Sequence, residues 1–371
     1  MPDHISEQVL LRLPVKSILR FRSVCKSWCA MIAEPRFVSL QLQMSKSRGL
    51  SMLILPLQNM NLHERMQRIR FIGYPGYGNV ARLVHERVCS SGFALWTHPL
   101  QCDGLVVAAA RLSSEIFVCN PATKEFVELP AGTPDVWDNF QKVGFGVDPS
   151  TGEHKVVRCF MRHYYSNEDF TSYSCGCEVF TLGSRAWRPA LDPPYVIVDM
   201  MPLSIPGAIY WSAGSPPATP RMLRFDLQDE EFTNFPPPPC MDLEDHYSYL
   251  TELGGKLCYC HSPGDTVQLW VADDGATKAA PWSQLCTIKL LRPCREIIPF
   301  AAYEGGIFLY VNFSVICRYD TGRQVLEPVV NMHRDMDYFL SEDKLYPFGL
   351  GASNWIHFVV QYSESMVTIG N

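Results

Sequence analysis

The sequence lacks the segments that would take it into or across a membrane. No apolar run approaches the roughly 20 residues that a membrane-spanning helix needs. The N-terminus is not typical of a secretory signal, because Asp3, Glu7, Arg12 and Lys16 interrupt its apolar positions. The 14 cysteines are scattered, and without an export signal we expect reduced thiols rather than a disulfide framework. We therefore expect a cytoplasmic or nuclear protein with no membrane partner.

Motifs that carry enzyme chemistry are also missing. The sequence contains no G-x-S-x-G, H-E-x-x-H or Walker motif, which mark hydrolases, zinc proteases and phosphate-binding loops. Two groups, Cys175 with Cys177 and Cys258 with Cys260 and His261, lack the two-residue spacer usual in structural zinc sites. Buried thiols and a histidine at the rim are the simpler interpretation. We predict no catalytic residue, no metal ligand and no cofactor.

Charge is distributed unevenly along the chain. The formal net charge is −6, but residues 1–42 contain six Lys or Arg against three Asp or Glu, so they carry +3 and the remainder carries −9. An acidic body is not expected to bind the phosphate backbone of nucleic acid over a broad surface. The basic residues of the head are most simply a solvated face. We therefore expect two modules with different partners and no direct nucleic-acid binding.

The first 42 residues predict three short helices. Ile5, Val9, Leu10 and Leu13 recur at helical spacing before Pro14 ends the pattern. Two further stretches repeat this spacing: Val15, Ile18 and Leu19, and then Val24, Trp28, Met31 and Ile32 before Pro35. A unit of this size buries too little surface to be stable alone. Its apolar residues are expected either to dock a partner or to pack on the larger domain.

After residue 42 the pattern changes to short apolar or alternating runs separated by Gly, Pro, Asn and Asp, which predicts an all-β body. Turn residues that open an apolar strand recur at intervals of 48 to 55 residues: Gly104, Gly152, Gly207, Gly255, Gly306 and Asn354. An aromatic residue just before a turn recurs at intervals of 45 to 49 residues: Phe180, Phe225, Trp270 and Tyr319. This period is typical of propeller blades. Six markers predict six blades, and strands from residues 50 to 95 are expected to complete the short last one and close the ring.

The run "MPDHISEQVLLRLPVKSILRFRSVCKSWCAMIAEPRFVSLQL" resembles a plant F-box, with the blocks "RLPVKS", "RFRSVCKSW" and "PRF" in the family's order and spacing. Met1 stands where the family usually has Leu, and Ser6 where many members have an apolar residue. The resemblance implies docking onto a Skp-family adaptor, which connects to a cullin and a RING subunit carrying the ubiquitin-charged enzyme. It assigns the adaptor contacts to nine residues, some of which must instead hold the helices together: Pro2, Ile5, Val9, Leu10, Leu13, Pro14, Val24, Cys25 and Trp28. Trp28 is the first choice for a binding hot spot.

The body resembles the F-box-associated, kelch-like domain of plant F-box proteins through "CDGLVVAAA", "CNPATKEFVELP" and "GFGVDPSTGEHKVVR". The expected domains are an F-box at 1–42, a linker with blade-completing strands at 43–98, and a kelch-like β-propeller at 99–371. The resemblance implies a non-catalytic substrate-recognition subunit of an SCF-type ubiquitin ligase. Such a subunit captures an unknown target protein for ubiquitination and proteasomal degradation.

No motif identifies the target. Asp242, Glu244, Asp245, His246 and Tyr247 form an acidic loop between blades and are candidates for target contact, although a solvated loop is the simpler interpretation. Two other functions stay open beside that of a ligase subunit. The first is a propeller enzyme or small-ligand binder, which predicts convergent polar residues in the central channel. The second is an adaptor-bound scaffold that acts outside degradation.

Overall fold

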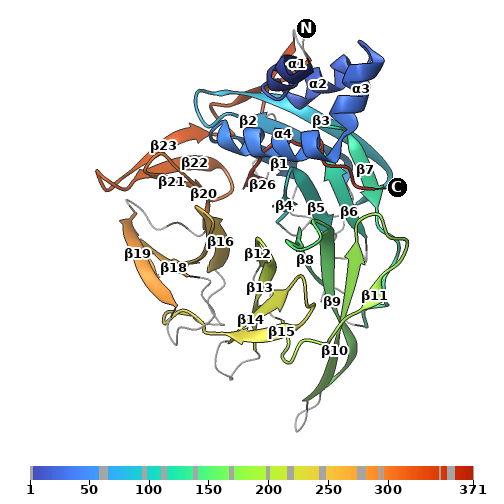
Figure 1. Ribbon diagram of the computed structural model, residues 1–371. Helices are drawn as coiled ribbons and strands as arrows, with labels where there is room; N and C mark the ends of the chain where they lie inside the picture. Colours follow the sequence, from blue (N-terminus) through green and yellow to red (C-terminus); the bar gives the residue numbers. More distant parts are fainter. Residues whose placement is uncertain are drawn as a thin grey trace.

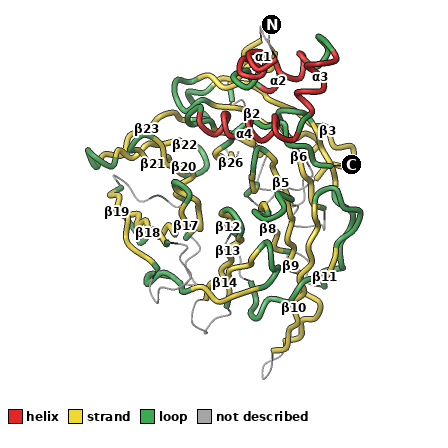
Figure 2. Tube along the Cα trace, viewed as in Figure 1, coloured by secondary structure: helices red, strands yellow, loops and turns green. Residues whose placement is uncertain are grey.

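The computed structural model describes residues 3–57, 66–93, 98–109, 115–136, 141–166, 171–197, 201–214, 221–241, 248–273, 281–290, 294, 296–341, 344–348 and 356–370. Four helices are followed by strands arranged as a ring (Figures 1 and 2). The helices are α1 (Asp3–Leu10), α2 (Val15–Phe21), α3 (Lys26–Ala33) and α4 (Pro35–Ser47). None of the helices in these ranges is long and apolar enough to span a membrane.

The fourth helix corrects the expectation of three. Pro35 was interpreted as the end of the helical pattern, but it occupies the first turn of α4. Proline is favourable there because its missing N–H is one that a helix start leaves unpaired in any case. α4 continues past residue 42 and buries Phe37, Gln41 and Ser45 at four-residue intervals, so its inner face does have helical periodicity.

Five sheets have four antiparallel strands each and form blades 1 to 5. Their strands in chain order are β4 (Leu100–Cys102), β5 (Leu105–Ala109), β6 (Ile116–Asn120) and β7 (Glu125–Glu128); β8 (Lys142–Val147), β9 (His154–Ser166), β10 (Thr171–Thr181) and β11 (Arg188–Pro189); β12 (Leu203–Ile205), β13 (Ala208–Ala213), β14 (Arg221–Asp226) and β15 (Phe232–Phe235); β16 (Tyr249–Leu253), β17 (Lys256–His261), β18 (Thr266–Ala272) and β19 (Trp282–Lys289); and β20 (Ile297–Tyr303), β21 (Gly306–Val311), β22 (Val315–Asp320) and β23 (Val325–Asn331). Each blade is therefore a meander of consecutive strands.

Blade 6 is built from both ends of the chain. Its strand order is β25-β24-β3-β2-β1-β26. The N-terminal part supplies β1 (Met52–Leu57), β2 (Met66–Tyr74) and β3 (Val80–Phe93), and the C-terminal part supplies β24 (Asp337–Ser341), β25 (Lys344–Pro347) and β26 (Ile356–Gln361). β1 and β26 pair antiparallel over six residues, from Met52 opposite Gln361 to Leu57 opposite Ile356. This pairing closes the ring, as the short last repeat led us to expect, and β24–β25 adds a hairpin that the repeat did not indicate.

The inner strands contact one another around the centre in the order β4, β8, β12, β16, β20 and β26, and β26 returns to β4 (Figure 1). The apolar core is accordingly divided into six clusters, each lying between two neighbouring blades. A single twisted blade leaves both of its faces apolar, so each face is buried only against the next blade. The six-bladed propeller predicted from the repeat is confirmed.

Four of the repeat markers, Gly104, Gly152, Gly207 and Gly255, lie in turns where the backbone φ is positive. Gly104 and Gly207 join the first and second strands of their blades with φ of 80° and 86°, a region that favours glycine. Turns between third and fourth strands use a side-chain oxygen instead. Asn120, Asp226 and Asp320 each accept backbone N–H bonds of 2.8–3.3 Å from the residues two and three positions later. These local contacts explain why turn residues recur once per blade.

Candidate protein-binding surface

Polar contacts at several helix ends help to hold the helical module together. The Cys25 Sγ accepts the backbone N–H of Trp28 at 3.4 Å, which satisfies a free donor at the start of α3. Pro14 precedes α2 and provides no side-chain cap. Arg48, which follows α4, donates from Nη2 to the Leu11 carbonyl at 2.8 Å. The helices are thus joined by polar contacts as well as by their apolar faces.

The interior of the helical module is small. It consists of a single cluster of buried apolar residues: Leu10, Leu11, Val15, Ile18, Ile32, Phe37 and Met366. Met366 comes from the C-terminal end of the chain. Ser6, where many F-box sequences have an apolar residue, is also buried. The inward face of α1 is therefore formed by Ser6, Leu10 and the following Leu11, and not by Ile5 and Val9.

Three of the predicted contact residues lie on the outside of the module. Ile5 is 43% exposed, Val9 is 48% exposed and Val24 is 59% exposed. Pro14 and Cys25 are also exposed. Trp28 is half-buried, and its ring packs edge-on against Phe21 with centroids 5.6 Å apart. Apolar side chains at this exposure are what a docking face needs, because partner contact removes them from water.

The remaining predicted residues have other positions. Leu10 is 1% exposed and holds the helices together, so it is not available to a partner; the sequence analysis expected this of some members of the set. Leu13 is half-buried, and Pro2 lies outside the described residues. Phe21, the last residue of α2, is half-buried and meets Trp28 of α3 only through the packing of two helices, so helical spacing in the sequence does not indicate this contact.

Exposed basic residues lie close in the chain to one of the exposed apolar positions, Val24. Arg20, Arg22 and Lys26 are all exposed and lie within four residues of Val24 in the chain. In Figure 1, α1, α2 and α3 lie together at one side of the ring, and α4 lies across β1 and its neighbours. The helices reach the ring through α4 and the C-terminal segment, for example by Gln41 and Lys46. The small helical module thus exposes apolar side chains, among them Val9 and Val24, together with basic ones.

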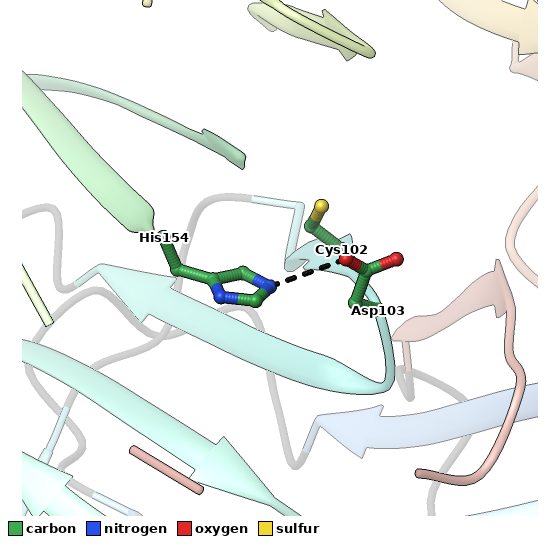
Figure 3. A group of neighbouring side chains, drawn as sticks. All are labelled: Cys102, Asp103 and His154. Atoms are coloured by element: carbon green, nitrogen blue, oxygen red, sulfur yellow. Dashed lines mark ion pairs between the residues drawn. The ribbon is translucent and has the colours of Figure 1, made fainter. Parts of the chain in front are cut away.

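A mixed group of possible metal ligands lies where α4 meets the ring. The ligand atoms of Cys102, Asp103 and His154 are all within 4.8 Å of one another (Figure 3). Cys102 ends β4, Asp103 lies in the turn that follows, and His154 begins β9. The Lys46 Nζ lies 2.6 Å from Asp103 Oδ1, and the His154 Nε2 lies 3.4 Å from Asp103 Oδ2.

The charges in this group are already balanced without a metal ion. Burial opposes ionisation of Asp103, but hydrogen bonds from His154 and Lys46 outweigh burial and lower the pKa of Asp103 to about 2. Burial raises the pKa of Cys102 to about 12, so the thiol is protonated near neutral pH, whereas a metal ligand must be a thiolate. We assign the group to the contact between α4 and blades 1 and 2.

The cysteine groups considered from the sequence lie inside the blades. Cys175 and Cys177 are buried free thiols on β10, and Cys258 and Cys260 are buried free thiols on β17. Burial raises the pKa of Cys175 to about 11 and that of Cys258 well above its usual value. His261 ends β17 and lies 3.3 Å from the Ser248 hydroxyl. Cys177, Cys258 and Cys260 are therefore packing residues of the interblade clusters, and Cys175 packs against Met161 within blade 2.

A carboxyl group with a shifted pKa lies beside the inner strands. Glu296 precedes β20, and its carboxylate accepts a hydrogen bond from the Tyr249 hydroxyl at the start of β16. Burial raises the pKa of Glu296 to about 7. The Asn312 N–H donates to the Glu296 carbonyl at 2.7 Å. The hydrogen bond from Tyr249 connects blade 4 to blade 5, so a structural role accounts for the half-buried Glu296 carboxyl group.

The candidate target contacts Asp242, Glu244, Asp245, His246 and Tyr247 lie outside the described residues.

Two protein families match this chain. The F-box domain family matches residues 1–40, and the F-box associated beta propeller domain family matches residues 89–369. The second match covers well over half of the sequence. The protein therefore belongs to the plant-type F-box proteins that carry an F-box-associated β-propeller, and this combination implies a role of the substrate-receptor type.

The chain is similar to several F-box proteins of Arabidopsis thaliana. An F-box/LRR-repeat protein is 28% identical over 299 residues, which cover 76% of this chain and 66% of that protein. An F-box protein is 27% identical over 85% of this chain and 73% of that protein. An F-box/kelch-repeat protein is 25% identical over 84% of this chain and 87% of that protein.

Proposed function

We propose that this protein is the substrate-recognition subunit of an SCF-type ubiquitin ligase. The F-box docks on a Skp-family adaptor, which is connected through a cullin to a RING subunit, and the propeller captures a target protein for ubiquitination and degradation. The subunit performs no chemistry of its own. It raises the rate of ubiquitin transfer by holding the target close to the charged ubiquitin carrier. This role requires a cytoplasmic or nuclear location.

The observation that supports the proposal most directly is the uncovered apolar face of the helical module. Ile5, Val9 and Val24 stay exposed although the same chain contains a large ring against which they could pack. Exposed apolar groups are costly unless a partner covers them. The basic residues Arg20 and Arg22 beside this face favour an acidic partner surface.

The propeller offers a separate surface for the target. β9 and β10 pair with each other beyond the ends of β8 and β11, so they form a two-stranded extension of blade 2. Tyr164, Tyr165 and Tyr173 on this extension are each more than 40% exposed. Tyrosine provides large contact area with few rotatable bonds, which suits protein recognition. In Figure 1 the extension points away from the helices, so both surfaces can be occupied together.

The adaptor contact is tested with the double variant Val9→Asp/Val24→Asp in the full-length chain. It is expected to weaken binding to a purified Skp-family adaptor on the order of 100-fold, because it places two carboxylates in a contact that excludes water. Val136→Asp is the matched control, because Val136 is 59% exposed and lies on the ring. Titration calorimetry measures both. Undiminished binding by the double variant would show that this face does not bind the adaptor.

The consequence for the target is tested in cells with the same double variant. A chain that captures its target but cannot bind the adaptor should hold the target without ubiquitinating it. We expect proteins labelled by a proximity enzyme fused to the double variant to include the wild-type targets at increased abundance. If the double variant and the wild type label the same proteins at equal abundance, and proteasome inhibition does not change this, the result would instead support the scaffold function.

A further inference from the structure

The chain that follows β26 connects the two modules. Residues 362–370, here named the C-terminal segment, have no regular secondary structure and in Figure 1 end beside β7 and near α4. On the ring side, the Asn120 side chain donates from Nδ2 to the carbonyls of Ser365 and Val367 at 3.1 and 2.8 Å. The Ile369 N–H donates to Glu125 Oε2 at 3.0 Å. The segment is therefore bound to blade 1 along its length.

The same segment reaches into the helical module. Met366 is buried in the apolar cluster of the helices. The Gln41 Nε2, on α4, donates to the Glu364 carbonyl at 3.5 Å, and the side chain of Gln41 is fully buried. The Glu364 Oε1 lies 3.5 Å from Arg48 Nη1. One short segment thus supplies an apolar residue, a backbone acceptor and a carboxylate to the helices.

Glu364 also lies near the start of α2. α2 begins at Val15 after Pro14 and has no side-chain cap of its own, so its first N–H groups need an acceptor from elsewhere. Burial raises the pKa of Glu364, and the backbone N–H of Val15 and the charge of Arg48 oppose this shift. The Glu364 carboxylate, more than 300 positions away in the chain, therefore lies near the start of α2 as well as near Arg48, and a negative charge is favourable at a helix N-terminus.

The ring is shaped to admit this segment. Gly104, in the turn after β4, has φ of 80°, and a Cβ atom built there would lie 2.5 Å from the Ser365 Oγ. The Ser365 hydroxyl donates to the Asp103 carbonyl at 2.6 Å. Asp103 in turn binds Lys46 of α4. The turn therefore carries no side chain at the point where the segment passes between blade 1 and the helices.

We infer that the C-terminal segment is a strap that fixes the orientation of the F-box relative to the propeller, with Glu364 as its positioning residue. The inference rests on the proposed function for its significance. The probability that a target lysine meets the ubiquitin carrier depends on the distance and angle between adaptor and target, and a fixed connection keeps both constant. The inference itself concerns only the mobility of the helices on the ring.

The experiment compares Glu364→Gln with Glu327→Gln in the full-length protein. Both variants remove one carboxylate charge from an arginine pair of similar length, 3.5 Å for Arg48–Glu364 and 3.6 Å for Arg323–Glu327. Glu327 lies on blade 5 and has no contact with the helices among those described. Amide hydrogen exchange is followed by mass spectrometry. Glu364→Gln should raise exchange about fivefold in α2 and α4, because it removes the carboxylate that pairs with Arg48 after α4 and lies near the start of α2, and leave the blades unchanged.

Orientation is measured separately by pulsed electron resonance. Spin labels are attached through an unnatural amino acid at Ala30 on α3 and Lys289 on β19, which are both exposed. The distance distribution should broaden in Glu364→Gln and stay narrow in Glu327→Gln. Equal exchange and equal distributions in the two variants would overturn the strap. Neither measurement includes an adaptor or a target, so a failure of the proposed ligase function would appear only in the adaptor titration.

Discussion

The helical module and the propeller solve the problem of apolar surface in opposite ways. The propeller closes into a ring, and each blade face packs against the next blade. Six apolar clusters are therefore buried between blades of the same chain. The helices have one small cluster, complete it with Met366 from the far end of the chain, and leave Val9 and Val24 outside. Closure makes the propeller self-sufficient, and its absence makes the helices dependent on other surfaces.

The two modules should respond differently to destabilising substitutions. Losing a contact inside the ring should lower the stability of the whole propeller, whereas losing a contact inside the helices should increase local opening of that small unit. Two substitutions test this difference, and a third tests one half-buried carboxyl group of the ring.

The largest effect is expected for Glu178→Ala in blade 2. The Arg158 Nη1 lies 2.6 Å from Glu178 Oε1, and the two side chains are 1% and 5% exposed. Removing Glu178 leaves a buried guanidinium without its counter-charge, which costs about 3–5 kcal/mol of unfolding free energy. Denaturant unfolding measures the loss. Glu327→Ala removes the carboxylate of the exposed pair with Arg323 and should cost less than about 0.5 kcal/mol of unfolding free energy. An equal loss in both variants would show that burial of the Arg158–Glu178 pair inside the propeller does not matter for stability.

A smaller and more local effect is expected for Leu10→Ala. Leu10 is 1% exposed in the helical cluster, and truncating a buried leucine costs about 2–5 kcal/mol. The neighbouring Val9 is 48% exposed, so Val9→Ala should cost less than about 0.5 kcal/mol. Hydrogen exchange should rise in α1 to α4 for Leu10→Ala alone while the blades stay protected. Increased exchange throughout the blades would show that the modules unfold together.

The smallest effect is a pH dependence from Glu296. Burial raises the pKa of Glu296 from 4.5 to about 7, so the folded state binds this proton more tightly than the unfolded state. The contribution to stability is present below the unfolded pKa and is lost as pH rises towards 7. Glu296→Gln cannot ionise and keeps an oxygen for the Tyr249 hydroxyl. The variant should gain stability over the wild type as pH rises from 5 to 8, on the order of 1 kcal/mol for this partly exposed group. An unchanged difference across this range would refute the assignment.

The blade repeat was predictable because its signals are local. Gly104 and Gly207 mark turns with positive φ, and the oxygens of Asp226 and Asp320 bind their own turns. Each such requirement is met within about five residues, so the pattern is visible in the sequence. The same holds for α1 to α3, where proline and helical spacing set the limits. The sixth marker, Asn354, lies outside the described residues.

One interpretation was wrong, and one choice was left open. Pro35 was assigned as a helix end although it begins α4. Some of the nine residues were expected to hold the helices together, and of the neighbours Val9 and Leu10 only Leu10 is buried. Locally, a proline fits either end of a helix and an apolar residue fits either side. The choice depends on what packs against α4 and α1, and part of that surface is Met366.

The sequence by itself determined the class of the domains, the number of blades and the position of the F-box, because turn geometry and strand and helix periods are written in neighbouring residues. The tertiary structure decided which helical side chains stay exposed, the pairing of β1 with β26, and the pairing of Glu364 with Arg48. These features join residues about 300 or more positions apart, and a single contact at that separation leaves no period in a sequence.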